Sequence, residues 1–172
     1  MLLPSHDEFV RPEWIDSNGH MNLAYYIVVF DQALDVVFDS LDIGTAYRRR
    51  SGSSTFAVET HTLYLREVIE GEAVRVTSRL LGVDAKRLHW FQEMHHLASG
   101  EIAASLEQMN LHIDLRTRRV APWPADRLAA LRAATDPGPW PQAAGRRIAL
   151  PGGRVSAPPV GDQGEHERAQ DR

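Results

Sequence analysis

Residues 23–41, LAYYIVVFDQALDVVFDSL, decide the fold of this chain. Apolar side chains recur along this stretch at steps of three and four residues, the spacing that puts them on one face of an α-helix. Asn22 stands where an N-cap is expected, and Gly44 where a helix stop is expected. The pattern therefore predicts one helix of about five turns that buries a single face.

The sequence after Gly52 changes to an alternation of period two, which is typical of strands. Four strand-like runs are separated by short turns, at 56–65, 73–84, 87–96 and 101–114, and a shorter run lies at 8–11. Short connections favour antiparallel neighbours. We expect an α+β fold in which a curved antiparallel β-sheet wraps around one long central α-helix, with a short second helix at 125–134.

The size and composition of the chain favour one domain. With 172 residues, of which 43% are hydrophobic, the chain can build one core but is short for two. Large apolar residues become rare after residue 136, while proline and glycine become frequent. We expect a globular domain at 1–136 and a loosely ordered tail at 137–172.

Several function classes are disfavoured by composition. The absence of cysteine removes disulfides, thiolate nucleophiles and cysteine-based zinc sites, and fits a reducing compartment. A net charge of −4 argues against a nucleic-acid surface. No run approaches the roughly 20 apolar residues of a membrane span, and the first residues lack the pattern of a signal peptide. We expect a cytoplasmic protein without nucleic-acid or membrane partners.

Three polar residues that suit catalysis crowd the loop before the predicted helix: Asp16, Asn18 and His20. Free backbone N–H groups and the positive end of the helix dipole gather at a helix start, so this loop adjoins a natural site for an oxyanion. Each residue also has a purely structural interpretation. Asp16 could cap the loop, and His20 could be a packed, hydrogen-bonded histidine.

The run Asp-x-Asn-Gly-His-Met-Asn-x-x-Tyr-Tyr, residues 16–26, resembles the hotdog-fold thioesterases. This family includes the 4-hydroxybenzoyl-CoA thioesterase-like group and the plant acyl-ACP thioesterases. The resemblance covers about residues 8–124 and implies a hotdog fold that hydrolyses thioesters. The Asp-x-Asn-x-His triplet of the plant enzymes matches Asp16, Asn18 and His20. Their strand-borne catalytic glutamate corresponds to Glu67, in the run 64–67.

The chain departs from the 4-hydroxybenzoyl-CoA subgroup at Asn18, where that subgroup has its catalytic aspartate. Because an amide is neither a nucleophile nor a base, the catalytic acid must be Asp16, Glu67 or Glu59. In the mechanism that we expect, Asn18 and a backbone N–H at the helix start hold the thioester carbonyl. His20 or Glu67 is the base for water, and Asp16 orients or serves as nucleophile.

A narrower resemblance concerns the runs 64–67, 86–89, 107–109 and 112–114. They look like those of the thioesterases associated with L-carnitine dehydrogenase, which implies betainyl-CoA as substrate. A trimethylammonium group favours an aromatic cage or a carboxylate. The available residues are Trp14, Tyr25, Tyr26, Phe30, Trp90 and Phe91, together with Glu59. Aromatic residues at these spacings could equally be ordinary core.

Binding of CoA requires contacts to its phosphates. The basic candidates at predicted strand ends are Lys86, Arg87, Arg116, Arg118 and Arg119, although they could also be solvated turn charges. The family resemblance further implies a homodimer or homotetramer, with sites between protomers.

No cofactor or metal is expected. Glu59 and His61 share a strand face, but no third ligand is identifiable. Two other functions stay open. One is a hotdog hydratase or dehydratase acting on an acyl thioester, and the other is a non-catalytic acyl-CoA-binding protein.

Overall fold

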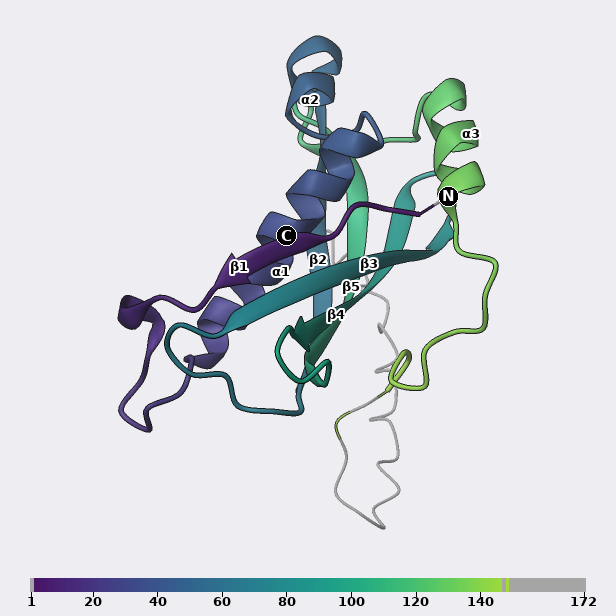
Figure 1. Ribbon diagram of the computed structural model, residues 1–172. Helices are drawn as coiled ribbons and strands as arrows, with labels where there is room; N and C mark the ends of the chain where they lie inside the picture. The colour runs from purple at the N-terminus through teal and green to yellow at the C-terminus, as the bar shows by residue number, and fades with distance from the viewer. Residues whose placement is uncertain (1, 147, 149–172) are drawn as a thin grey trace, which may run out of the picture.

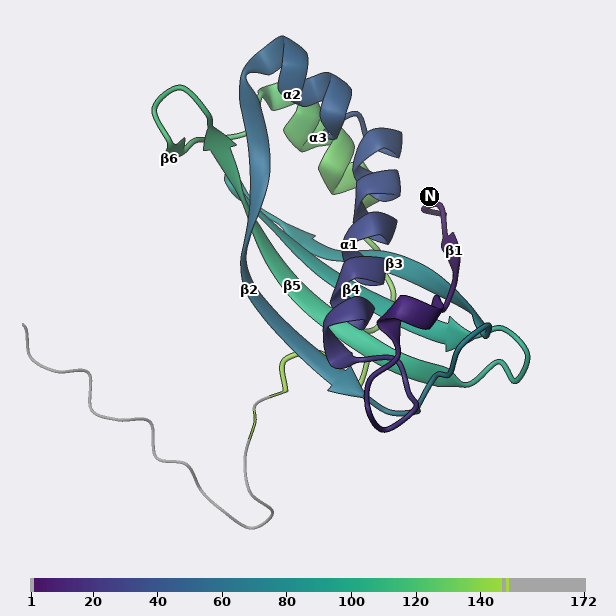
Figure 2. The same ribbon diagram turned by 90° about the vertical axis from the view of Figure 1, so that its left-hand side faces the viewer.

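The computed structural model of the protein describes residues 2–146 and 148. Its centre is α1, Leu23–Ser40, which lies along the concave side of a strongly curved sheet (Figures 1 and 2). The sheet is built mainly from β2, Ser53–Tyr64; β3, Ala73–Val83; β4, Arg87–His96; and β5, Ile102–Asp114. The shorter elements are β1, His6–Phe9; the 3-10 helix η1, Pro12–Trp14; α2, Thr45–Ser51; β6, Arg119–Val120; and α3, Ala125–Ala134.

The strands pair in the order β1-β3-β4-β5-β2, with β6 on β5, and every pairing is antiparallel. The predicted α+β class and the curved antiparallel sheet wrapped around a central helix are confirmed. This arrangement is the hotdog fold. The four long strands and the helices at 23–41 and 125–134 also lie where the sequence predicts them, within a few residues at their ends.

The helix α1 is held by its apolar face. Phe30 is 1% exposed and Val37 is fully buried, and burying such a side chain stabilises a fold by about 1.5–3 kcal/mol. The sheet also reaches the helix backbone, since the Gln92 side chain donates a hydrogen bond to the Phe30 carbonyl at 3.0 Å. The buried residues of α1 are Tyr26, Val29, Phe30, Ala33, Leu34, Val37 and Phe38.

The expected helix stop at Gly44 is wrong. α1 ends at Ser40, and Gly44 is the N-cap of α2, where a Cβ would overlap the Asp39 carboxylate. The arginine run 48–50 forms the last turn of α2, because arginine favours helices and the break comes only at Gly52. Gly52 has a φ of 67°, a left-handed conformation that suits glycine at a helix end.

The short N-terminal strand is β1 at His6–Phe9, two residues before the expected run 8–11. The chain turns away from the sheet after Val10, whose N–H bonds to the Glu72 carbonyl, because Pro12 begins η1.

The segment after α3 runs over the outer face of the sheet, which is the face opposite α1. Arg79 on β3 donates to Asp136 at 2.6 Å and to the Pro139 carbonyl at 2.7 Å. The Gly145 N–H donates to Glu107 on β5 at 2.7 Å. Residues 136–146 thus contact the sheet, whereas most of the tail expected at 137–172, namely residues 147 and 149–172, lies outside the described residues.

No helix in the described part of the chain is both long and apolar enough to cross a membrane.

The N-cap of α1 offers a test of how the helix start is fixed. The Asn22 side chain accepts a hydrogen bond from the Ala24 N–H at 3.0 Å. We expect Asn22→Ala to lower the free energy of unfolding by about 1 kcal/mol, and Asn22→Asp, which keeps the acceptor, to lose much less. Urea unfolding measures both. Equal losses in the two variants would contradict the capping role.

Candidate active site

The loop that leads into α1 is a closed turn. Ile15 and Met21 form an isolated antiparallel bridge, and the Asp16 N–H donates to the His20 carbonyl at 3.0 Å. Asp16 Oδ1 accepts the Asn18 N–H at 2.7 Å. This hydrogen bond is the capping role that Asp16 can play by itself. The second carboxylate oxygen of Asp16 makes no hydrogen bond within the described residues.

A second loop, between β2 and β3, meets the first. The Met21 N–H donates to the Val68 carbonyl at 2.8 Å, and Val68 is fully buried beneath the contact. This contact brings His20 Nε2 to 3.1 Å from Glu67 Oε2. The His20 side chain is 34% exposed and that of Glu67 73%, so the pair faces a solvent-accessible space. Two residues that the resemblance singled out separately therefore form one acid–imidazole pair.

A pocket of about 410 Å³ opens beside this pair. Aromatic rings form one wall, where Tyr26 and Tyr64 pack edge to face with ring centroids 5.2 Å apart. Burial raises the pKa of the Tyr26 phenol, and the neighbouring Glu67 carboxylate raises it further. Burial also raises the pKa of the Tyr64 phenol. Both phenols are therefore neutral at pH 7. The pocket is lined by Asp16, His20, Met21, Leu23, Tyr26, Tyr64, Leu65, Arg66 and Glu67.

The start of α1 borders the same pocket. The Ala24 N–H is taken by the Asn22 side chain, and the Tyr25 N–H bonds to the Asn22 carbonyl. The Leu23 N–H makes no hydrogen bond within the described residues, and Leu23 lines the pocket. An uncommitted amide at the positive end of a helix is a donor suited to a developing oxyanion.

Other predicted site residues lie outside this pocket. Asn18 is exposed at the tip of the first loop and does not line the pocket. Trp14 and Tyr25 stack on each other, with centroids 5.3 Å apart, and neither lines it. Trp90 is fully buried beside Phe38 in the core under the far half of α1. The structure therefore brings only Tyr26 of the proposed aromatic set to the acid–imidazole pair.

Glu59 lies on the outer face of the sheet. It lines a separate hollow of about 270 Å³ with His61, His89 and Glu107. His89 Nε2 lies 2.6 Å from Glu107 Oε1 there. Within residues 2–146 and 148, no group of three or more His, Asp or Glu side chains is arranged to hold a metal ion.

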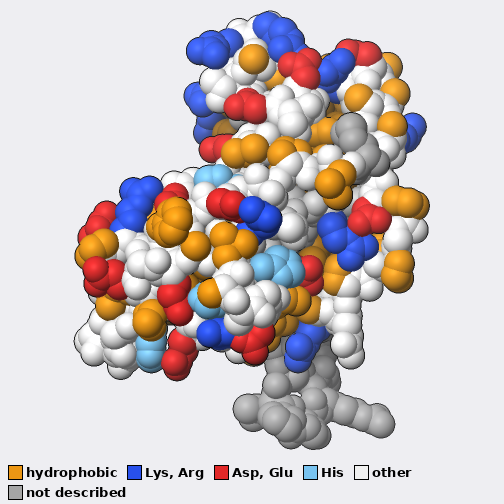
Figure 3. Space-filling model, in the orientation of Figure 1, with side chains coloured by type: hydrophobic (Ala, Val, Ile, Leu, Met, Phe, Trp, Pro, Cys, Tyr) orange, Lys and Arg blue, Asp and Glu red, His pale blue; other side chains and the backbone are white. Residues whose placement is uncertain are grey.

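The predicted CoA contacts lie at the end of the folded domain that is opposite the pocket. Lys86 and Arg87 follow β3, whereas Arg118 and Arg119 follow β5, and all four are exposed. The pocket lies where β2 ends, and the 12 residues of β2 span about 40 Å at about 3.3 Å each. Arg87 is paired with Asp84 at 2.6 Å, and Arg118 lies over the Phe56 ring. Figure 3 shows basic side chains in blue at this end, over α2.

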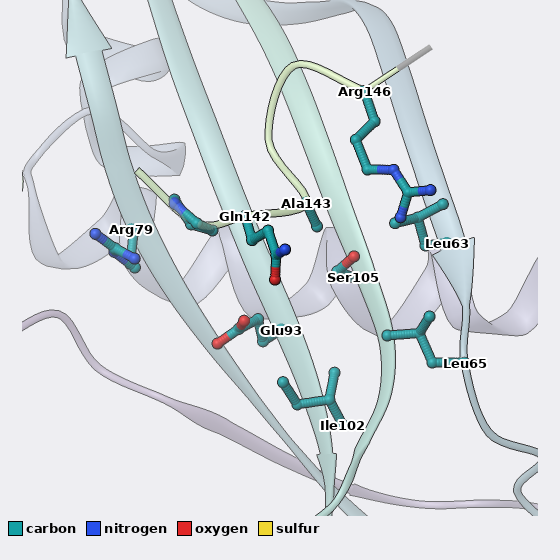
Figure 4. A pocket seen from close by; sticks show the side chains of 10 residues that line it. Leu63, Leu65, Arg79, Glu93, Ile102, Ser105, Gln142, Ala143 and Arg146 are labelled. Atoms are coloured by element: carbon teal, nitrogen blue, oxygen red, sulfur yellow. The ribbon is translucent and has the colours of Figure 1, made fainter. Parts of the chain in front are cut away.

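A larger hollow, about 650 Å³, lies on the outer face under residues 141–146 (Figure 4). Its floor carries Leu63, Leu65 and Ile102, and Arg79 and Arg146 lie at its rim. It holds no histidine and one carboxylate, Glu93, so it lacks the acid–imidazole pair that the smaller pocket has. Size alone therefore does not identify the site.

Sequence reasoning missed five of the residues that line the pocket: Met21, Leu23, Tyr64, Leu65 and Arg66. Tyr64 and Arg66 belong to the run 64–67, which the resemblance matched to the catalytic glutamate of the plant enzymes. Their place in this run could have indicated that they line the same pocket as Glu67.

A hotdog fold with an acid–imidazole pair beside a helix start suits an enzyme that hydrolyses thioesters. The chain belongs to the thioesterase-like superfamily, whose family model matches residues 10–131.

Two relatives carry more specific names. A betainyl-CoA thioesterase of Pseudomonas aeruginosa is 39% identical over 153 residues, which cover 87% of this chain and 96% of the relative. An L-carnitine dehydrogenase/betainyl-CoA thioesterase of Rhizobium meliloti is 37% identical over 73% of this chain, but over 25% of its own length. The narrower resemblance seen in the sequence is thereby confirmed.

Solved structures agree with the fold. The Staphylococcus aureus protein SAV2348, solved in complex with CoA, superposes with a TM-score of 0.78 at 29% identity, over 88% of this chain and 98% of its own. A putative thioesterase of Pseudomonas putida KT2440 gives a TM-score of 0.73 at 32% identity, over 88% and 99%.

Proposed function

We propose that this protein hydrolyses betainyl-CoA to betaine and free CoA in the cytoplasm. The observation that carries the proposal is the His20–Glu67 pair at 3.1 Å, in a pocket that is also lined by Leu23, whose N–H has no hydrogen-bond partner among the described residues. The names of the Pseudomonas and Rhizobium relatives support the choice of acyl group.

The pocket chemistry suits a short cationic acyl group. Tyr26 and Tyr64 offer aromatic surface, which attracts a quaternary ammonium through the ring quadrupole. Asp16 and Glu67 add two carboxylates to the lining. The one arginine in the lining, Arg66, is paired with Glu101, so its charge is compensated. A trimethylammonium group would therefore meet a negative, partly aromatic environment.

The mechanism follows from where the donors and the base lie. The Leu23 N–H donates to no acceptor among the described residues, so we assign it to the thioester carbonyl oxygen. Glu67, held by His20, removes a proton from water as the water oxygen attacks the carbonyl carbon. The tetrahedral intermediate then collapses, the C–S bond breaks, and CoA leaves as the thiolate. Asp16, which lines the pocket, orients the water; direct attack by its carboxylate is the alternative route.

A homodimer is the assembly that we propose. β2 is an edge strand of 12 residues, and the described part of the chain leaves its outer edge unpaired. Val58, Tyr64 and Leu65 expose 54%, 46% and 57% of their surface along or near that edge. A long edge with apolar residues is suited to pairing with another strand.

Antiparallel pairing of β2 with β2 of a second copy would also bring together the two halves of the binding site. It would set the start of one β2 beside the end of the other. The Lys86, Arg87, Arg118 and Arg119 end of one copy would then lie near the pocket of its partner. This arrangement reconciles the predicted CoA contacts with their distance from the pocket in one chain.

The hydrolytic site is tested by following free thiol during incubation with betainyl-CoA. We expect Glu67→Gln and His20→Ala each to lower kcat/KM by about 100-fold, the lower end of what a general base contributes. Glu70→Gln, an exposed acid three residues away, is the matched control and should keep the wild-type rate. Unchanged rates in both site variants would refute the site.

The same incubation separates the alternative functions. Change in the acyl chain without thiol release would indicate a hydratase, and thermal stabilisation by ligand without turnover would indicate a binding protein.

Selectivity for the cation is tested with a neutral substrate of the same shape. In 3,3-dimethylbutanoyl-CoA a carbon replaces the ammonium nitrogen of betainyl-CoA. We expect kcat/KM to favour betainyl-CoA by about 10-fold or more, as a partly desolvated cation–π contact implies. Tyr64→Leu should reduce that ratio. Equal kcat/KM values for both substrates in the wild type would contradict cation recognition.

The proposed interface is tested by charging the edge of the sheet. Val58→Lys places a charge on β2, and Phe9→Lys, at a residue 64% exposed, places the same charge on β1 at the opposite edge. We expect sedimentation to show a dimer for the wild type and Phe9→Lys, and a shift to monomer for Val58→Lys. A monomeric wild type would refute the dimer.

A further inference from the structure

A buried histidine at the end of β4 is not used by the mechanism. His96 ends β4, and its side chain is 6% exposed. Its Nδ1 accepts the Ser99 N–H at 3.2 Å and lies 3.0 Å from Ser99 Oγ. A neutral imidazole whose Nδ1 accepts must carry its proton on Nε2, which lies 3.1 Å from Glu72 Oε1. His96 therefore ties the β4–β5 turn to Glu72.

The loop that carries Glu67 is attached to this histidine on both sides. Before Glu67, the Arg66 guanidinium donates to Ser99 Oγ at 2.6 Å. After Glu67, the Ile69 N–H donates to Glu72 Oε2 at 2.9 Å, and the other oxygen of Glu72 meets His96. These contacts form one continuous chain of contacts, which runs from Arg66 through Ser99 and His96 to Glu72.

The backbone on either side of Glu67 is also held by hydrogen bonds from α1 and the loop before it. Tyr26 Oη donates to the Arg66 carbonyl at 3.3 Å, and the Met21 N–H donates to the Val68 carbonyl at 2.8 Å. The peptide units flanking Glu67 are thus held, whereas its side chain is 73% exposed and pairs with His20. Little packing fixes the Glu67 side chain directly, so its place depends on the loop.

We propose that His96 and Ser99 are positioning residues that hold Glu67 opposite His20. The inference rests on the proposed function, in which Glu67 is the base. Displacement of a catalytic group by about 1 Å can cost up to about 100-fold in rate, so a loop that relaxes by a fraction of that distance should lose measurable activity. Neither His96 nor Ser99 lines the pocket, so substrate binding should change little.

The first experiment separates kcat from KM. For Ser99→Ala and His96→Leu we expect kcat for betainyl-CoA to fall about 10-fold, with KM changed less than about 2-fold. Ser99→Thr, which keeps the hydroxyl, should recover most of the loss. His95→Leu is the matched control, because His95 is the neighbouring residue on β4 and pairs with Glu93 at 3.7 Å, outside this chain of contacts. Wild-type kcat in both Ser99→Ala and His96→Leu would overturn the proposal.

The second experiment asks whether the effect runs through Glu67. In a Glu67→Gln background, we expect Ser99→Ala and His96→Leu to cause no further loss, because the residue that they position no longer acts as a base. Additive losses would overturn the positioning role and leave the proposed function intact. Full activity of Glu67→Gln by itself would instead refute Glu67 as the base, and both proposals with it. Ser99 is exposed, so Ser99→Ala gives an answer even if His96→Leu fails to fold.

Discussion

Burial of the apolar face of α1 in the curve of the sheet is the constraint on which the rest of the structure depends. Val29 and Val37 are fully buried, eight residues apart on one face of the helix, so the helix cannot shift along the sheet without exposing apolar surface. Its first turn is consequently fixed relative to the end of β2. The Leu23 N–H and the two loops beside it take their positions from that packing.

The site itself is made of two loops that are distant in sequence and joined by few contacts. The hydrogen bond from Met21 to Val68 connects them, and His20 meets Glu67 next to it. Because the pair is largely exposed, its geometry relies on backbone contacts and not on tight side-chain packing. Residues behind the loop, such as His96, therefore matter to our proposal although they do not line the pocket.

Charge is distributed unevenly along the molecule. Acidic and aromatic groups gather at the start of α1, and exposed basic residues gather at the opposite end of β2. A cationic acyl group and the phosphates of CoA have opposite charge requirements, and within one chain the acidic and basic groups lie at opposite ends of the 12-residue strand β2. Two antiparallel copies would place both requirements at each site, which is why the proposed function and the proposed dimer support each other.

The sequence by itself determined the helix, the four long strands and the hotdog family, because periodicity and the 16–26 motif are local signals. It also identified Asp16, His20, Tyr26 and Glu67, each of which lines the pocket. Only the tertiary structure decided that Glu59 lies on the outer face, that Trp90 is core, and that Asn18 lies outside the pocket. These outcomes depend on which face of the sheet and which end of the molecule a residue occupies, and both are set by non-local pairing of strands that no short motif encodes.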